Sequence, residues 1–207
     1  MKIGIIGTGN MGGGLGKAWA ARDNRVFFSA RDAGKAQAAA KAAGHGAQSG
    51  TVAEAVKFSD VVLLATPWGS VQEALRSAGP LTGKVIIDCT NPLAADMSLA
   101  VGHNTSGAEE IAKWASDAKV VKAFNHVLAQ VVAGPKIGEQ NATVFYCGDD
   151  AAAKDVVKKL IADIGFEPVD AGPLKNARYI EPLAGLAIQL AYGQKMGTDL
   201  AIKLIRR

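Results

Sequence analysis

The first fifteen residues, MKIGIIGTGNMGGGL from Met1 to Leu15, decide the fold. The apolar run at residues 3–6 is short enough to be a buried strand, and residues 15–21 have the composition of a helix. Between them, residues 7–12 read GTGNMG and match the glycine pattern GxGxxG. A glycine pattern that follows a strand and opens a helix is typical of a turn that binds a dinucleotide. The alternative is a glycine-rich turn in an unrelated fold.

Each glycine of this turn has a separate physical reason. Gly7 makes the tight turn after the strand, Gly9 lets the backbone approach a pyrophosphate, and Gly12 lets the helix pack closely on the strand. The free N–H groups and the positive dipole end of the helix then face the phosphates. We therefore predict cofactor binding by six consecutive residues, namely Gly7, Thr8, Gly9, Asn10, Met11 and Gly12.

Composition narrows the class of protein. The chain has 207 residues, of which 49% are hydrophobic, so it is long enough for one domain, or one domain with an appendage, around a real core. Its net charge of +4 is modest and no cluster of Lys and Arg stands out, which argues against nucleic acid and suits an anionic cofactor. Cys89 and Cys147 lack the spacing of a metal site, and we expect two buried free thiols and no metal.

No targeting or membrane segment is visible. The chain starts with a strand rather than with the cationic start and long apolar run of a signal peptide. No apolar stretch reaches the roughly 18 residues that a membrane span requires. We therefore expect a soluble cytoplasmic protein that does not contact membranes.

The residues after the second predicted strand, 25–29, indicate which dinucleotide binds. An NAD-binding fold places an acidic residue there to bind the ribose hydroxyls, whereas this chain has Arg31, with Lys35 one helical turn later. Two cations suit a 2′-phosphate, and an arginine can also stack on adenine. The sequence therefore predicts NADP rather than NAD. In the alternative, Arg31 is a solvated loop residue and Asp32 binds the ribose.

Strands and helices alternate along the first 170 residues. We predict an α/β fold, a Rossmann-like doubly wound and mostly parallel sheet with a C-terminal helical segment. Residues 1–172 form the NADP-binding part, and residues 173–207 form a helical segment that is interrupted near Gly193. Residues 51–54 match a capping box, and the short run 166–169 is an edge strand because Pro168 cannot donate to a ladder. The other predicted strands are 61–65, 84–88, 119–124 and 143–148.

Polar and aromatic residues follow three of these strands. Because parallel strands end at one edge of a sheet, we expect them to line the ligand site together. They are Thr66, Pro67 and Trp68, then Asn91 and Pro92, and then Asn125 and His126. The first five are predicted to bind the cofactor, and the last two are assigned to a hydride acceptor, which the family resemblance described below implies. Asn125 can also be a simple turn residue.

Hydride transfer between a nicotinamide and a flavin-like ring requires no nucleophile, metal or acid–base group, since the cofactors carry the chemistry. The sequence shows no catalytic triad, no HExxH motif and no paired carboxylates. Arg178 is the third residue assigned to the acceptor, because it could pair with an acidic or phosphate-bearing group. The alternative for Arg178 is a salt bridge with Glu181 at the start of a helix.

Four stretches together resemble the NADPH-dependent coenzyme F420 reductases. They are residues 7–12, residues 66–68, Cys147-Gly-Asp-Asp150, and Asp170-Ala-Gly-Pro-Leu-Lys-Asn-Ala-Arg178. The resemblance runs from Met1 to about Leu204. It implies hydride transfer between NADP and a deazaflavin, coenzyme F420. Residues 121–125, VKAFN, are especially similar to the reductase domains of the STEAP metalloreductases, which pass hydride from NADPH to a flavin, so FMN or FAD is a second possible acceptor.

Two positions differ from the deazaflavin enzymes. The family's serine before the phosphate-binding arginine is Ala30 here, and the family's usual histidine is Asn125, with His126 shifted by one. One alternative is therefore an NADPH-dependent imine or ketone reductase. Those enzymes require a large helical substrate domain, whereas the segment after Asn125 contains predicted strands. A second alternative is a non-catalytic NADP sensor, which would keep Gly9 and Arg31 but need no acceptor pocket.

The C-terminal segment is so apolar that its own domain or a second subunit has to bury it. Its small and apolar residues recur at helical spacing, and a second stripe is expected on a further helix near the end of the chain. The first stripe holds Leu183, Leu186, Ala187, Leu190 and Ala191, flanked by Gly185 and Gly193, and the second holds Leu200, Ala201 and Leu204. We predict a homodimer in which these helices meet across a two-fold axis. The alternative is a helix folded back on its own domain.

Overall fold

The computed structural model describes residues 1–207, and its centre is one eight-stranded sheet. The strand order is β10-β9-β6-β5-β4-β1-β2-β3, and the strands are parallel except that β9 and β10 run against the others. The strands are β1 Lys2–Ile6, β2 Arg25–Ser29, β3 Gln48–Gly50, β4 Val61–Leu64, β5 Val85–Asp88, β6 Lys119–Lys122, β9 Thr143–Gly148 and β10 Glu167–Asp170. The predicted mostly parallel, doubly wound sheet is confirmed.

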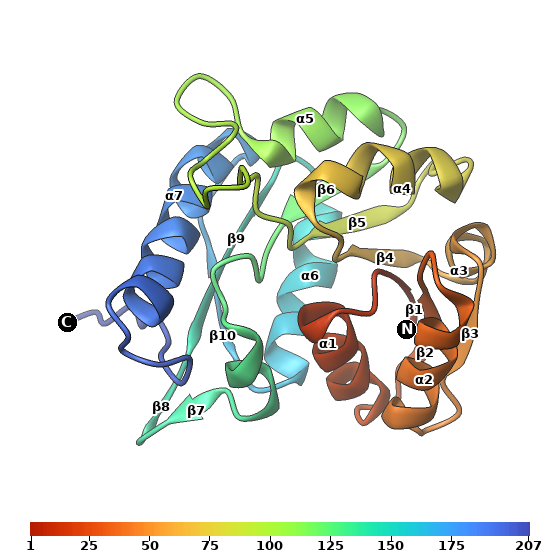
Figure 1. The fold of residues 1–207 in the computed structure, drawn as a ribbon, viewed down its shortest axis with the longest axis horizontal. Helices are drawn as coiled ribbons and strands as arrows, with labels where there is room; N and C mark the ends of the chain where they lie inside the picture. The colour runs from red at the N-terminus through yellow and green to blue at the C-terminus, as the bar shows by residue number, and fades with distance from the viewer.

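Helices cover both faces of this sheet (Figure 1). One face carries α1 Asn10–Ala20, α2 Ala33–Ala43 and α6 Ala151–Asp163. The other carries α3 Val52–Phe58, α4 Val71–Ala78, α5 Gly107–Trp114 and α7 Ala177–Ile188. Each layer of helices closes its own buried apolar cluster against the strands, which explains why the central strands are unbroken apolar runs.

Side-chain caps mark the starts of three helices, one of which the sequence predicts. Thr51 and Glu54 form the expected capping box at the start of α3, and Asp32 caps α2 by accepting the N–H groups of Gly34 and Lys35. The carboxylate of Asp150 likewise accepts the N–H of Ala153 at the start of α6. Strand β10 contains Pro168 and lies at the edge of the sheet, as expected.

The sequence did not predict three features. Strand β3 is a short edge strand, and β7 Lys136–Ile137 pairs with β8 Gln140–Asn141 in a small hairpin outside the main sheet. Short 3-10 turns lie at Trp68–Ser70, Ala129–Ala133 and Leu174–Asn176. None of these pieces is long enough to give a periodic signal.

The prediction that the chain is helical to its end is wrong. Helix α7 passes into a short π-helical turn, Gln189–Gly193, and residues 194–207 contain no helix. This tail instead lies along the start of β9, where Thr143 donates its N–H to Ile202 and its hydroxyl accepts the N–H of Leu204. Lys203 pairs with Glu167. The tail therefore satisfies the backbone N–H and the hydroxyl of Thr143 at the start of β9, and Leu200 packs on the core.

The two cysteines and the helices agree with what the sequence predicts about thiols and membrane spans. Cys89 and Cys147 are buried free thiols, and burial raises the pKa of each to about 12. No helix combines the length and the hydropathy of a membrane span.

The order of the strands reverses between β1 and β4, so the glycine turn after β1 lies at the point where doubly wound sheets open a crevice.

Candidate functional site

The glycine turn has the geometry that its spacing predicts. Gly7 has a φ of +103°, and a Cβ atom added there would lie 2.4 Å from the carbonyl oxygen of Ala65. A Cβ on Gly12 would lie 1.9 Å from the carbonyl oxygen of Gly7. Both positions therefore accept only glycine. By contrast, a Cβ on Gly9 would meet no protein atom within 4 Å, so the surface beside Gly9 is open for a ligand.

The first turn of α1 leaves its N–H groups available. Gly9 is the N-cap, no side chain caps the helix, and no acidic residue lies in its first turn. A helix start without a side-chain cap presents free donors and a positive dipole end, which suits a pyrophosphate. Asn10 and Met11 begin this helix, and Met11 packs partly on the core.

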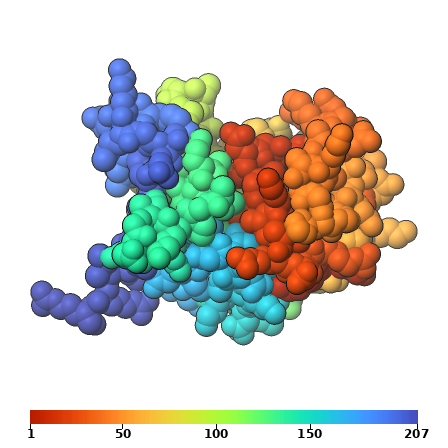
Figure 2. All heavy atoms as spheres, turned by 90° about the horizontal axis from the view of Figure 1, so that it is seen from below, coloured from red at the N-terminus to blue at the C-terminus, as the bar shows by residue number.

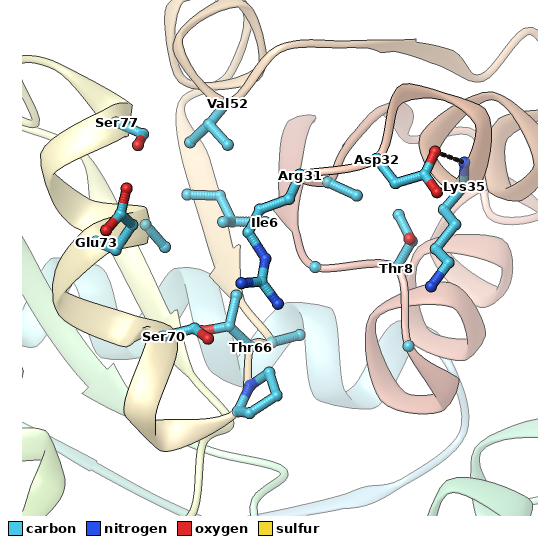
Figure 3. A pocket seen from close by; sticks show the side chains of 16 residues that line it. Ile6, Thr8, Arg31, Asp32, Lys35, Val52, Thr66, Ser70, Glu73 and Ser77 are labelled. Carbon is cyan, nitrogen blue, oxygen red and sulfur yellow. Dashed lines mark hydrogen bonds between the residues drawn. The ribbon is translucent and has the colours of Figure 1, made fainter.

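A cavity of about 560 Å³ lies between this turn, the loop after β2 and helix α4. It brings together seven of the residues that the sequence assigns to the cofactor, namely Gly7, Thr8, Gly9, Arg31, Lys35, Thr66 and Pro67. Figure 3 shows the guanidinium of Arg31 in the middle of the cavity, with Glu73 and Ser77 on the facing wall. The cavity therefore presents cations on one side and a mixed polar wall on the other.

The two cations of the cavity are free of ion pairs. Neither Arg31 nor Lys35 lies within salt-bridge distance of a carboxylate, whereas one carboxylate oxygen of Asp32 accepts the N–H groups of Gly34 and Lys35 at 2.8 and 3.3 Å. Asp32 thus has a structural task as the cap of α2. This arrangement favours a 2′-phosphate partner for the cations over a ribose partner for Asp32.

Thr66 supplies an independent sign of a ligand. Its hydroxyl oxygen is buried and has no hydrogen-bond partner, and it is the one buried side-chain polar atom of this kind in the structure. Such an atom costs about 1–3 kcal/mol of stability when it is left unpaired. Because Thr66 lines the cavity, a bound ligand that reaches this hydroxyl would remove the cost. The open surface at Gly9 and this orphaned hydroxyl both fit a dinucleotide.

Trp68 and Pro92 lie outside this cavity. The ring of Trp68 packs on that of Trp114, with centroids 5.5 Å apart, and both Trp68 and Pro92 lie against Gly107 at the start of α5. They therefore form a wall between α4 and α5 at the same edge of the sheet. Their assignment to the cofactor stays a prediction.

Asn91 and Asn125 meet, as expected for residues that end adjacent strands. Asn91 donates to the carbonyl oxygen of Asn125 at 2.8 Å, and the amide nitrogen of Asn125 donates to the side-chain oxygen of Asn91 at 3.1 Å and to the carbonyl oxygen of Ile180 at 3.2 Å. Phe124 is buried with a φ of +65°, which is unusual for a bulky residue and turns the chain sharply before Asn125. This amide pair links β5, β6 and α7.

His126 lies in the core rather than in the cavity. Its side chain is buried, its Nε2 atom lies 3.3 Å from both the N–H of Phe145 and the carbonyl oxygen of Thr143, and Nδ1 lies 3.5 Å from the Asn125 amide oxygen. Burial, with a smaller effect of the Lys122 charge, lowers the pKa of His126 to about 4. His126 is therefore neutral at pH 7, and its role toward an acceptor stays a prediction.

Arg178 has a partner, but not the one considered from the sequence. Its Nε and Nη2 atoms donate to both carboxylate oxygens of Glu109 at 2.9 and 2.7 Å. This hydrogen-bonded pair raises the pKa of Arg178 and lowers that of Glu109. The alternative pairing with Glu181 does not form, because Glu181 points into the protein and binds Lys122 instead. About a third of the Arg178 side chain is exposed, which leaves it open to an anionic acceptor.

Sequence reasoning missed a buried ion cluster below the amide pair. Lys122, Asp88 and Glu181 are each almost completely buried and lie in hydrogen-bond contact. The sequence signal that could have found it is a charged residue at the carboxyl end of each of two apolar strands. These residues are Asp88 and Lys122, which are register partners on β5 and β6. Glu181 joins them only through the packing of α7. No group of three or more His, Cys, Asp or Glu side chains is arranged to hold a metal ion.

Comparisons with known proteins agree with this geometry. A family model described as "NADP oxidoreductase coenzyme F420-dependent" matches residues 2–92. The F420-dependent NADP reductase of Methanothermobacter marburgensis is 32% identical over 213 residues, which cover 92% of this chain and 92% of that protein. The metalloreductase STEAP3 of Rattus norvegicus is 30% identical over 204 residues, and the match spans 98% of this chain but only 40% of that protein.

A solved structure extends the likeness to the whole fold. The crystal structure of a putative F420-dependent NADP reductase from Arthrobacter sp. FB24 superposes with a TM-score of 0.91 at 28% identity, covering 100% of both chains. The similarity of the backbone therefore extends over the whole chain, through α7 as well as the glycine turn. The chain belongs to the F420-dependent NADP reductase family, a family of NADP-dependent oxidoreductases.

Proposed function

We propose that this protein transfers a hydride between NADP(H) and a deazaflavin acceptor of the coenzyme F420 type. The observation that carries the proposal is the cavity after β1, where two unpaired cations, an open glycine turn and the orphaned hydroxyl of Thr66 face one space. The acceptor is supported by the relative named F420-dependent NADP reductase, which aligns with this chain over nearly its whole length.

The cavity suits the adenosine half of NADP(H). Arg31 and Lys35 would bind the 2′-phosphate, because charge-assisted bonds from these cations are the strongest contacts the cavity offers. The glycine turn and the first N–H groups of α1 would bind the pyrophosphate. Thr66 and Pro67 then lie where the dinucleotide leaves the cavity toward the ends of β5 and β6.

The neighbouring edge of the sheet suits the two reacting rings. The dinucleotide, when bound, supplies the hydride, so the chain has to orient and shield the rings without transferring protons. Asn91 and Asn125 present amide groups there, Trp68 and Pro92 form a wall, and Arg178 offers a cation to an anionic acceptor. The pKa of His126 near 4 fits this chemistry, because no proton donor at neutral pH is needed.

Steady-state oxidation of NADPH against a panel of acceptors tests the proposal. We expect turnover with coenzyme F420 and weaker or no turnover with FMN, FAD, cyclic imines and ketones. Turnover with an imine and none with the deazaflavin would overturn the proposal in favour of an imine reductase. Tight NADPH binding without turnover of any acceptor would instead identify an NADP sensor. NADH serves as the control donor.

We also propose a homodimer formed through the outer face of α7. Two large apolar side chains there, Tyr179 and Leu186, are each more than half exposed, as are Tyr192 and Met196 just after the helix, and this C-terminal segment lies at one end of the molecule in Figure 2. An apolar face of this kind is typical of a contact between subunits. Gly185, beside Leu186, has no atom near its missing Cβ, which allows the close approach of a second helix.

Light scattering of point variants tests the dimer better than truncation does. Removal of residues 173–207 would also remove Leu174, Ala177 and Ile180 from the core. Leu186→Asp changes only the outer face, and we expect it to halve the molar mass while NADPH still binds. Ile137→Asp, on the β7–β8 hairpin, is the matched control for an added surface charge. An unchanged mass for Leu186→Asp would contradict the proposed interface.

A further inference from the structure

The ammonium of Lys122 uses all of its hydrogen-bonding capacity inside the protein. Its Nζ atom lies 2.9 Å from Asp88 Oδ2, 2.8 Å from Glu181 Oε1 and 2.7 Å from the carbonyl oxygen of Thr90. Burial by itself lowers the pKa of Lys122, but the charges of Asp88 and Glu181 outweigh burial and raise it. The lysine therefore stays charged, with three acceptors for its three donors.

One side of the cluster fixes the loop that carries Asn91. The Oδ1 atom of Asp88 accepts the N–H of Thr90 at 2.8 Å and its hydroxyl at 2.7 Å. Together with the bond from Lys122, every polar group of Thr90 is held by the cluster. Asn91 follows directly in the chain, so its position depends on the ion cluster below it.

The other side of the cluster fixes helix α7. Glu181 accepts the N–H groups of Gly107 and Ala108 at 2.8 and 3.0 Å and so caps α5, while it also binds Lys122. The preceding residue, Ile180, accepts the bond from Asn125. Two adjacent residues of α7 thus hold the helix to the sheet edge, one through the ion cluster and one through the amide pair.

Stability alone is a weak reason for such a cluster. Buried ion pairs can often be replaced by apolar residues without loss, because desolvation offsets the attraction. This cluster also carries one more negative than positive charge. What it does provide is a fixed arrangement of polar atoms, and it leaves the side-chain oxygen of Asn125 with only one long contact, 3.5 Å from His126 Nδ1. That oxygen has no closer partner within the protein, so its hydrogen-bonding capacity is not used up.

We propose that Lys122, Asp88 and Glu181 are positioning residues that set the Asn91–Asn125 pair to receive the nicotinamide carboxamide of NADP(H). The proposal rests on the proposed binding of NADP(H), but not on the identity of the acceptor. None of the three residues lines the cavity that suits the adenosine half. The cluster therefore acts on one end of the dinucleotide and leaves the other end unaffected.

Two ligands distinguish the binding of the nicotinamide end from the binding of the adenosine end. NADPH carries the nicotinamide, whereas 2′-phospho-ADP-ribose has the same 2′-phosphate, adenine and pyrophosphate without it. Titration calorimetry gives the affinity of both for the wild-type protein and for Glu181→Gln. This variant removes one carboxylate charge and leaves Lys122 paired one-to-one with Asp88, so we expect it to fold. Asp88→Asn removes the other charge from the strand side and carries the same test if Glu181→Gln does not fold.

For each variant we expect NADPH to bind about tenfold more weakly, while the affinity for 2′-phospho-ADP-ribose stays within about twofold of wild type. The fluorescence of bound NADPH should change as well, because it reports the surroundings of the nicotinamide. Glu109→Gln is the control, since it also breaks a contact between α5 and α7 but lies outside the cluster. It should leave both affinities unchanged.

Equal weakening of both ligands would overturn the proposal, because the cluster would then support the whole fold rather than the nicotinamide end. Unchanged affinities in both variants would overturn it as well. These outcomes are independent of the acceptor panel, since no acceptor is present during the titrations. A wild-type protein that binds NADPH but reduces no deazaflavin would overturn the proposed function. It would leave the comparison between NADPH and 2′-phospho-ADP-ribose as a valid test of the cluster.

Discussion

The two halves of the candidate site differ in how their polar groups are satisfied. Around the glycine turn the groups are open: Arg31 and Lys35 have no ion pair, and the hydroxyl of Thr66 has no partner. At the ends of β5 and β6 the groups are closed, because Asn91 binds Asn125 and Lys122 binds two carboxylates and a carbonyl.

This difference teaches that the two halves perform different tasks. An open set of cations and N–H groups gains free energy only when an anionic ligand arrives, so the glycine side provides affinity. A closed network gains little from a ligand but holds a few atoms in fixed positions, so the amide side provides geometry. Substitutions on the first side should change the affinity for the shared adenosine half and pyrophosphate, and those on the second should change stability or the binding of the nicotinamide end alone.

The largest effect on ligand binding is expected at Gly9. A Cβ atom there would occupy the space next to the turn without touching the protein, so Gly9→Ala should keep the fold and weaken NADPH binding by roughly a hundredfold or more, about 2.7 kcal/mol. Titration calorimetry measures the affinity, and thermal unfolding checks the fold. Gly134→Ala, whose added Cβ also meets nothing, is the control. Wild-type affinity in Gly9→Ala would contradict the claim that the dinucleotide binds beside the glycine turn.

The largest effect on stability concerns the closed half and its pH dependence. The pKa of His126 is about 4 in the folded protein and 6.5 in the unfolded chain, so between these values the unfolded chain binds the extra proton. The free energy of unfolding should therefore rise with pH across this window, by about 3 kcal/mol. This stabilising contribution of His126 is fully present above pH 6.5.

Chemical denaturation of the wild type and of His126→Gln at several pH values isolates this contribution from that of the carboxylates. The variant should be less stable at pH 7, because it loses the hydrogen bond that Nε2 of the ring makes to the backbone of β9, but its stability should fall less steeply toward pH 4. His45→Gln changes an exposed histidine and should keep the wild-type slope. Parallel slopes for wild type and His126→Gln would place the titrating group elsewhere.

A smaller, selective effect is expected at Arg31. Loss of its charge-assisted bond to a 2′-phosphate should cost about 1.5–3 kcal/mol, on the order of ten- to a hundredfold in affinity. Arg31→Asp should therefore weaken NADPH far more than NADH, and competition titrations with both dinucleotides measure the ratio. Equal weakening of the two would mean that Arg31 does not recognise the phosphate. Lys35→Met should show the same selectivity to a lesser degree.

The smallest effect is expected at Arg178, which belongs to neither extreme because it is paired and yet partly exposed. Arg178→Met should lower stability only slightly, because the pair is partly exposed to solvent. It should leave NADPH affinity unchanged and raise the KM of the deazaflavin. Glu109→Gln breaks the same pair but keeps the cation, so it should share the stability loss without the rise in KM. The same KM in both variants would make Arg178 purely structural.

The sequence by itself determined the open half of the site. The spacing of Gly7, Gly9 and Gly12 fixes a turn between a strand and a helix, and the position of Arg31 after the next strand brings it to the same edge. The capping residues Asp32 and Thr51 mark helix starts in the same way. All of these follow from interactions within a few residues and from the direction of parallel strands, which local patterns record.

Only the tertiary structure decided the closed half. Glu181 binds Lys122, Arg178 binds Glu109, and His126 turns into the core because α7 packs on α5 and the C-terminal tail lies along β9. A charged residue can pair with any opposite charge that packing brings near, and sequence spacing does not rank those partners when they lie on different elements. The tail itself follows β9 because that strand has backbone groups to satisfy, a requirement that exists only once the sheet has formed.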